Sequence, residues 1–428
     1  MSAVARETVG ALLGRLWRDP AAWATTADIF VVLIALTLPW STSLVAIFAV
    51  ALLVTMLPFL DFAAFLQSLK RPICALPIAL FALAVAGTLW SDAPWGARLY
   101  AVGPTVKLLM LPALFYHFER STRGMQVFIA FLVSSVLLLA MSWVVAFAPS
   151  LALKSGAEYG VPVKNYIDQS QEFALCAVAL AYPIITLLRA GRIVPALLLS
   201  ATALGFVVNM AFVIVSRTAL VTMPIMLAVF ALLHLKWRTN VVIFCAVVVL
   251  AALAWTASPH LQWTTTTFLR DYRLYKERNI PTSIGLRLEF WEKSLRFFSE
   301  APVFGHGTGS TRGLFEQAAV GHVGAGAEVI GNPHNQTLNI AVQWGVIGIV
   351  VLYAMWLLHL QLFRGEGLAT WIGLLVVVQN IFTSLFNSHI FDFHEGWMYV
   401  VGVGVAGGMV LKTGSREAGL VPRNSDKS

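Results

Sequence analysis

The chain has 428 residues, of which 58% are hydrophobic and only 12% charged, and its mean hydropathy is +0.78. Soluble domains carry about 25% charged residues, so this composition excludes a soluble enzyme, a disordered protein and a coiled coil. It predicts an all-α polytopic membrane protein that forms a single integral membrane domain over residues 1–428. The net charge of +8 would suggest nucleic acid as a partner of a soluble protein. In a membrane protein it indicates orientation instead, and no nucleic-acid partner is expected.

Apolar runs of about 20 residues are candidate transmembrane helices. Twelve such runs follow one another along the chain: 24–40, 43–60, 72–90, 97–117, 125–148, 170–188, 193–212, 216–235, 239–257, 336–360, 368–386 and 396–411. The split between 193–212 and 216–235 has the least support, because little polar sequence separates them. Residues 414–428 are polar, which predicts a disordered tail.

Alternate connections between these runs are short and basic. They contain Lys70, Arg71, Arg120, Arg123, Arg189, Arg192, Lys236, Arg238 and Arg364. With twelve spans, these connections and both termini fall on one side, which the positive-inside rule makes cytoplasmic. Residues 258–335 then form a large loop outside the cytoplasm that contains helices, and we expect this loop to carry part of any active site.

Arg217 is the first candidate functional residue, because it interrupts an otherwise apolar run from Ile193 to Leu235. An arginine at membrane depth is costly and indicates a functional site, unless it only marks the outer end of a helix. Its guanidinium suits bidentate binding of phosphate better than a lysine would.

Arg287 is the second candidate, within the helical pattern of residues 283–300. One stripe of that helix carries Glu289, Glu292, Lys293, Arg296 and Glu300 and is expected to be a solvated face. Arg287 lies about 200° from Glu289 and points toward the side of Phe290 and Trp291. Snorkelling or a structural ion pair would explain this position, but we favour anion binding.

His334 is the third candidate. Pro333 disfavours helix at the residue before it, so His334 lies at a helix start, where a neutral imidazole can accept a proton from a hydroxyl group. A lone histidine is usually structural, and position must choose among the histidines expected outside the membrane. These are His260, His306, His322, His334, His389 and His394.

The segment from Pro302 to Ser310 carries glycines at 305, 307 and 309. It could form a phosphate-binding nest or a mobile loop over a site, but it lacks the ending of a P-loop. A metal site built from His389, His394, Glu395 and a loop histidine remains open, although its spacing is not of the HExxH type. No metal and no cofactor is therefore expected.

Together these residues resemble the O-antigen ligase family, within the O-antigen ligase and polymerase superfamily of the bacterial envelope. The family pattern has an Arg and a Trp four apart, a Pro, a Gly-x-Gly-x-Gly, and a His-Asn ahead of a helix with spaced glycines. In this chain the pattern falls on Arg287, Trp291, Pro302, Gly305, Gly307, Gly309, His334, Asn335, Leu338, Gly345 and Gly348.

The resemblance implies a GT-C-like membrane glycosyltransferase of lipopolysaccharide biosynthesis. It would lie in the bacterial inner membrane, with residues 258–335 as its large periplasmic loop and with its active site facing the periplasm. Such a protein takes a glycan from undecaprenyl pyrophosphate and joins it to lipid A–core oligosaccharide, with membrane lipids around it and without a metal or nucleotide cofactor. Arg217 and Arg287 would then bind and stabilise the diphosphate, and His334 would be the catalytic base. Asn335 and Trp291 would contact substrate. Attack in line at the anomeric carbon would invert its configuration.

Other functions remain open at this point. An O-antigen polymerase or a protein O-oligosaccharyltransferase is the alternative, although one large loop late in the chain fits the ligase best. A transporter is less favoured, because it would show charged or broken helices within several spans. A non-catalytic envelope scaffold is the least favoured.

Overall fold

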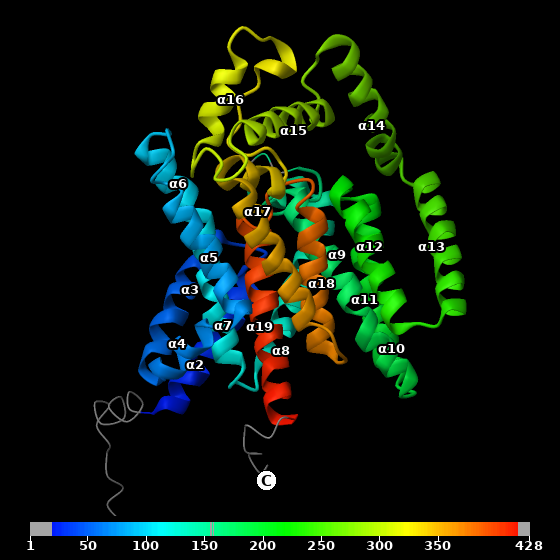
Figure 1. Ribbon diagram of the computed structural model, residues 1–428. Coiled ribbons are helices and arrows are strands. Elements are labelled where there is room, and N and C mark those ends of the chain that lie inside the picture. Colours follow the sequence, from blue (N-terminus) through cyan, green and yellow to red (C-terminus); the bar gives the residue numbers. More distant parts are fainter. Residues whose placement is uncertain (1–18, 155, 157, 418–428) are drawn as a thin grey trace, which may run out of the picture.

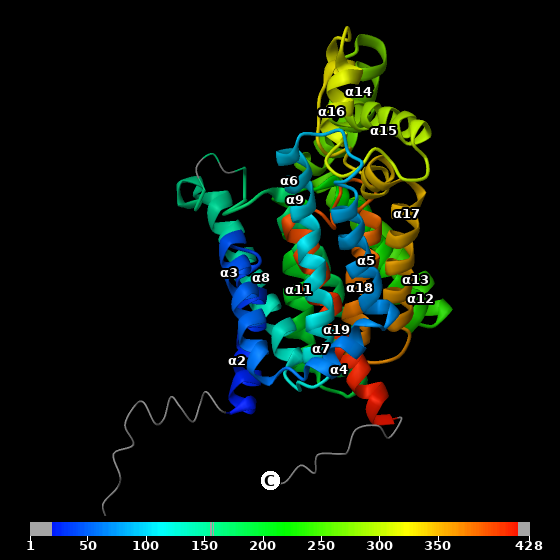
Figure 2. The same cartoon turned by 60° about the vertical axis from the view of Figure 1, so that its left-hand side comes forward.

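The computed structural model describes residues 19–154, 156 and 158–417, and every regular element in that part of the chain is a helix. The helices form an upright bundle, with α14, α15 and α16 lying across one end (Figures 1 and 2). The predicted all-α polytopic fold is confirmed. α19 continues to Glu417, so the first residues of the predicted tail are helical, and 418–428 lie outside the described residues.

Within the described residues, ten helical stretches are long and apolar enough to cross a membrane. They comprise α2 (Pro20–Thr37), α3 with η1 (Thr42–Phe59), α6 to α7 (Trp95–Phe118), α8 (Gly124–Phe147), α9 with α10 (Tyr166–Arg189), α11 (Ile193–Phe212), α12 (Arg217–His234), α13 (Trp237–Ala257), α17 (Gln336–Leu362) and α19 (Phe393–Gly414 of Phe393–Glu417).

Two of the twelve predicted spans differ from this set. α5 (Pro72–Ala86) has 15 residues and passes only together with α4 (Phe62–Leu69), from which it is bent by 78°, as an eleventh, broken span. α18 (Leu368–Thr383) has 16 residues and is too short for the same test. Both fall below the roughly 20 residues that a straight spanning helix needs, although each coincides with a predicted run.

The basic connections between helices lie at the end of the bundle opposite α14, α15 and α16 (Figure 1). That end also holds the start of α2 and the end of α19. The chain therefore separates its basic short connections from its long polar connection, as the sequence predicts. Which end is cytoplasmic stays a prediction from the charge rule.

α19 and α7 (Met110–Phe118) pack closely through a small-residue face. A Cβ added at Gly404 would lie 2.7 Å from the Leu114 Cβ, and one added at Gly408 would lie 2.5 Å from the Phe118 Cβ. The two glycines are one helical turn apart and so share a face. Glycines at this spacing let the side chains of one membrane helix pack directly on the backbone of the other.

α15 (Ser283–Glu300) is capped at its start by Thr282, whose hydroxyl accepts from the Gly285 N–H at 3.2 Å. It packs on α17 through a small aromatic core in which Phe290 and Phe297 meet Phe315 of α16 (Thr311–Ala319) and Val342 of α17. The apolar face of this outer helix is thereby buried against the outer end of α17.

The solvated stripe predicted for α15 is partly wrong, because Lys293 is buried. Its ammonium donates to the Gly326 carbonyl at 2.5 Å and lies 3.5 Å from Glu289. Glu289 in turn accepts from the Tyr275 hydroxyl of α14 (Pro259–Arg278) at 3.0 Å. Helical periodicity could not show that other parts of the 258–335 loop cover this face.

The glycine-rich segment 302–309 is fastened to a kink in α17. Gly345 interrupts that helix with φ 61° and ψ −155°, and a Cβ there would lie 2.3 Å from the Val303 carbonyl oxygen. The kink frees the carbonyls of Val342 and Gln343, which accept from the N–H groups of His306 and Gly307, both at 2.8 Å. These N–H groups are thus satisfied within the protein, so the segment is a structural clasp rather than a phosphate nest.

α13 stands apart from the bundle (Figure 1). None of the residues whose burial is described in its most apolar stretch is buried, and its main contacts are with its chain neighbours α12 and α14. The outer helices are thus joined to the bundle at the clasp and again where α14 begins, where the Ser258 hydroxyl donates to the Ala211 carbonyl of α11 at 2.8 Å.

Candidate functional site

Arg217 and Arg287 line one cavity of about 370 Å³. Its walls come from residues 213–218 at the start of α12, from α14 and from the start of α15, and one further side comes from the segment around the start of α9 (Tyr166–Ala179), which contributes Glu158, Tyr159, Tyr166 and Ile167. Two of the sequence-predicted residues, 70 positions apart, are therefore brought together at the outer end of the bundle.

The start of α12 contributes more than a side chain to this cavity. Arg217 is its first residue, and no side chain caps the helix. The Ser216 hydroxyl beside it is buried without a hydrogen-bond partner. Because the first N–H groups of a helix have no partner within it, an uncapped start is favourable for an anion.

Arg217 is held by a single weak pair. One of its terminal nitrogens lies 3.4 Å from an Asp271 carboxylate oxygen on α14, and about a third of the Arg217 side chain is exposed. A monodentate contact at this distance leaves most of the guanidinium donors available. Asp271 was not identified from the sequence, since it lies within an ordinary charged helix.

Arg287 forms no ion pair within the part of the chain that the structure describes, and it is half-buried. Burial lowers the pKa of its guanidinium, Tyr166 raises it, and the neighbouring Arg217 lowers it further. A desolvated cation without a counter-ion, next to another cation, is a strong site for an anionic ligand.

His334 is not among the residues that line this cavity, but it packs on α15, with its ring centroid 6.2 Å from that of Phe290, and Arg287 of the same helix lowers the pKa of its imidazole. Burial is the larger cause of the lowered pKa, and a hydrogen bond to Asn387 opposes it. The His334 backbone has φ 53°, which is unusual for a residue other than glycine. A neutral imidazole with a depressed pKa is suited to accept a proton near neutral pH.

Asn335 has its hydrogen-bonding groups taken up by protein, whereas the Trp291 indole Nε1 is buried without a hydrogen-bond partner in the described part of the chain. The Asn335 Oδ1 caps α17 by accepting from the Leu338 N–H at 3.1 Å, and its Nδ2 donates to the Leu385 carbonyl at 3.2 Å. Trp291 packs against the aromatic core beneath α15 and does not line the arginine cavity. Substrate contact by these two residues stays a prediction.

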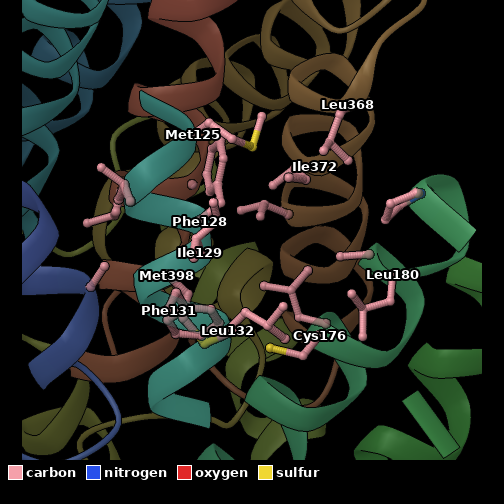
Figure 3. Close-up of a pocket in the computed structure, with 18 of the residues that line it drawn as sticks. Met125, Phe128, Ile129, Phe131, Leu132, Cys176, Leu180, Leu368, Ile372 and Met398 are labelled. Atoms are coloured by element: carbon pink, nitrogen blue, oxygen red, sulfur yellow. The ribbon is translucent and has the colours of Figure 1, made fainter. Parts of the chain in front are cut away.

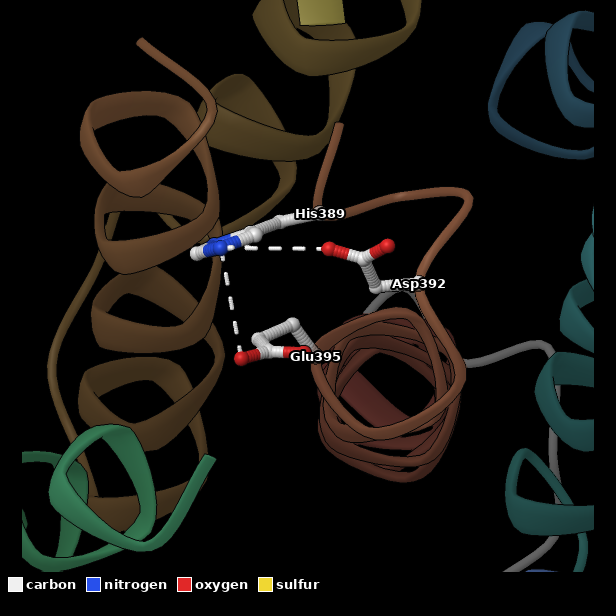
Figure 4. A group of neighbouring side chains, drawn as sticks. All are labelled: His389, Asp392 and Glu395. Carbon is white, nitrogen blue, oxygen red and sulfur yellow. Dashed lines mark ion pairs between the residues drawn. The ribbon is translucent and has the colours of Figure 1, made fainter. Parts of the chain in front are cut away.

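A buried polar cluster lies behind His334, where α18 ends and α19 begins. The ligand atoms of His389, Asp392 and Glu395 lie within 4.8 Å of one another, and the His389 Nε2 is 4.0 Å from an oxygen of each carboxylate (Figure 4). Burial raises the pKa of Asp392 to about 7, which Lys107 opposes, and lowers the pKa of His389 to about 3.

The cluster offers one nitrogen and two carboxylate oxygens, which could hold a divalent cation. It differs from the combination considered from sequence, because His394 instead pairs with Asp168 at 2.9 Å. The ammonium of Lys107 donates to the carbonyls of Phe391 and Asp392, so a positive charge already lies next to the cluster.

A separate cavity of about 320 Å³ is almost wholly apolar (Figure 3). It includes Met125 and Leu368, close to where α8 and α18 begin, and it reaches Cys176 and Met398. His334 and Asn387 lie beyond the opposite end of α18. This cavity opens at the surface, where the exposed Ile129 lines it, and none of the predicted site residues lines it.

The model of a protein family described as O-antigen ligase matches residues 202–353. An uncharacterized protein of Haemophilus influenzae is 25% identical over 162 residues, which cover 35% of this chain and 41% of that protein. The chain thus spans less than half the length of that relative. The family match contains all three predicted catalytic residues and supports a ligase- or polymerase-type function in O-antigen processing.

Proposed function

We propose that this protein is an O-antigen ligase. It would transfer O-antigen glycan from undecaprenyl pyrophosphate to lipid A–core oligosaccharide at the periplasmic face of the bacterial inner membrane. The observation that carries the proposal is the cavity in which Arg217, Arg287 and the uncapped start of α12 converge beside His334. The family match supports the same reaction class.

The two arginines would bind the diphosphate of the donor. When the anomeric C–O bond breaks, its electron pair goes to the diphosphate oxygen, and charge-assisted hydrogen bonds to guanidinium groups stabilise that oxygen. A diphosphate is already a good leaving group, so no strong general acid is needed. Because the arginines and the helix start supply the positive charge, the proposed mechanism is metal-independent.

His334 would act as the general base. A hydroxyl group of the acceptor sugar would give its proton to the imidazole while its oxygen forms the new bond to the anomeric carbon. Attack from the face opposite the departing diphosphate would invert the configuration at that carbon. The proton would then leave His334 for solvent.

The decisive experiment supplies the purified protein with undecaprenyl-pyrophosphate glycan and lipid A–core and resolves the products by gel. A joined product is expected. If the glycan is instead lengthened on its lipid carrier, the protein is an O-antigen polymerase. If transfer requires a protein acceptor, it is a protein O-oligosaccharyltransferase. Transport of the donor without any new glycosidic bond would overturn the enzymatic proposal.

A further inference from the structure

The hydrogen bonds around His334 determine which of its two nitrogens carries the proton. We infer that Asn332 and Asn387 hold His334 in the tautomer with hydrogen on Nδ1 and a free lone pair on Nε2, with Asp392 fixing the orientation of Asn387. Asn332, Asn387 and Asp392 are then positioning residues. The consequence for catalysis rests on the proposed function, whereas the tautomer itself does not.

The inference starts from a donor whose identity is certain, the backbone N–H of His334. It donates to the Asn332 Oδ1 at 3.0 Å, and the Ser388 hydroxyl donates to the same oxygen at 2.7 Å. If the Asn332 amide were turned over, its NH₂ group would face a backbone N–H, which is a contact between two donors. The Asn332 Nδ2 must therefore point the other way, toward Asn387.

The orientation of Asn387 follows from that of Asn332. The Asn332 Nδ2 lies 3.1 Å from the Asn387 Oδ1, which can only accept, and the Asn387 Nδ2 donates to an Asp392 carboxylate oxygen at 2.6 Å. Turning Asn387 over would break both contacts at once. Asn332 on one side and Asp392 on the other thus hold Asn387 so that its oxygen, rather than its NH₂ group, faces the His334 ring.

The tautomer follows directly. The His334 Nδ1 lies 2.9 Å from the Asn387 Oδ1, and an amide oxygen has two lone pairs and no hydrogen to give. The Nδ1 must therefore be the donor, which leaves Nε2 as the basic nitrogen of the neutral ring. Nε2 has no hydrogen-bond partner within residues 19–417 as described, so its lone pair is available to a substrate hydroxyl.

This arrangement discriminates between two roles for His334. A neutral ring whose N–H is taken up by Asn387 cannot donate to a diphosphate through Nε2, but it can accept a proton there. The charged and titratable groups near the ring are Arg287 from α15 and His389 from the segment after α18, and Asp392 reaches the ring only through Asn387. Arg287 and His389 therefore do not favour a proton on Nε2 in the resting protein, which keeps that lone pair free.

The test measures the tautomer without any transfer reaction. Protein labelled with ¹⁵N-histidine is studied in detergent above the imidazole pKa, and His334 is assigned by its absence in His334→Gln. The inference expects a protonated Nδ1 and a bare Nε2. Asn387→Asp keeps an acceptor toward Nδ1 and should keep this pattern, whereas Asn387→Leu removes it and should shift the proton toward Nε2. A proton on Nε2 in the native protein would overturn the inference.

The kinetic arm uses the same pair of variants. Asn387→Leu should lower turnover about 10- to 100-fold, as is typical when the group that orients a functional histidine is removed, with little change in donor affinity. Asn387→Asp should recover most of the loss.

If Asn387→Leu does not fold, Asn332→Asp replaces it. An acid at position 332 can only accept, so Asn387 turns over to donate to it, and the proton on His334 should move to Nε2. If His334 carries its proton on Nδ1 but the native protein transfers no glycan, the proposed function is rejected and the inference stands. If the tautomer of His334 is unchanged in Asn387→Leu or Asn332→Asp, the inference is rejected and the proposed function stands.

Discussion

The two halves of the site are built in opposite ways. On the arginine side, Arg217 has one contact of 3.4 Å and Arg287 has no ion-pair partner within the described chain. On the histidine side, His334 lies in a closed set of hydrogen bonds that continues through Asn387 to Asp392. Under the proposed function, the cations that would receive a large anion keep free donors, while the proposed base, whose direction matters, is held in place. The predictions below test this contrast.

The largest effect is expected at His334. His334→Ala should lower the transfer rate by about 10²- to 10⁴-fold, the usual contribution of general-base catalysis, and should leave donor affinity nearly unchanged. Rates and binding of lipid-linked donor are measured side by side, with His322→Ala as control because His322 is exposed. An equal loss of affinity and rate would assign His334 to the diphosphate instead.

A smaller loss is expected for Arg217→Lys and Arg287→Lys. A lysine keeps the charge but loses the planar fork, and a charge-assisted hydrogen bond contributes about 1.5–3 kcal/mol, which corresponds to roughly 10- to 150-fold. Donor affinity should fall with the rate. Arg312→Lys is the matched control, since Arg312 is exposed on α16 and pairs with Glu316. Native kinetics in both cavity variants would show that these arginines do not hold the donor.

The pH dependence tests the state of the base. Burial and Arg287 lower the pKa of His334 from its ordinary value of 6.5, so the ring stays neutral to a lower pH than a free imidazole. Transfer should therefore persist at pH 6.5 and decline only in more acidic solution, as the ring gains its proton. A rate profile that already falls above pH 6.5 would contradict this order.

A slight effect is expected for Asp271→Asn, which releases Arg217 from its partner. Partly exposed ion pairs contribute about 0.2–1 kcal/mol, so donor affinity should rise by roughly 1.5- to 5-fold at low salt. The gain should vanish in Arg217→Ala, which removes the charge that Asp271 contacts, and a double-mutant cycle measures that coupling. Weaker donor binding in Asp271→Asn would mean that the carboxylate orients Arg217 rather than competing with the ligand.

No effect at all is expected from removal of divalent cations. If the arginines carry the charge of the leaving group, transfer should continue in EDTA at its native rate. Loss of activity that added Mg²⁺ or Mn²⁺ restores would make the cluster of His389, Asp392 and Glu395 the first place to look for the ion.

The sequence was informative where one residue breaks a pattern. Arg217 interrupts an apolar run, Arg287 lies off the charged stripe of its helix, and His334 follows a proline. The structure brings the two arginines to one cavity and places His334 near Arg287. The apolar runs likewise coincide with the helices, because a long hydrophobic stretch has few other structures open to it.

The residues that sequence analysis missed depend on packing between distant segments. Asn387 and Asp392 follow α18, more than 50 positions after His334, and only the contact between that segment and the start of α17 joins them. Lys293 looked solvated because the periodicity of one helix cannot reveal what covers it. The glycines at 305 and 307 looked like a phosphate nest until the kink at Gly345 supplied acceptors for the N–H groups there.

The clasp at Gly345 also sets how the outer helices can move. The end of α15 is fixed to α17 through the 302–309 segment, and the start of α14 is fixed to α11 by the Ser258 hydroxyl, which donates to the Ala211 carbonyl at 2.8 Å. Because α14 and α15 are held at both ends, movement of the poorly buried α13 would leave the Asp271–Arg217 contact in place. It would equally leave His334 packed against Phe290, with ring centroids 6.2 Å apart.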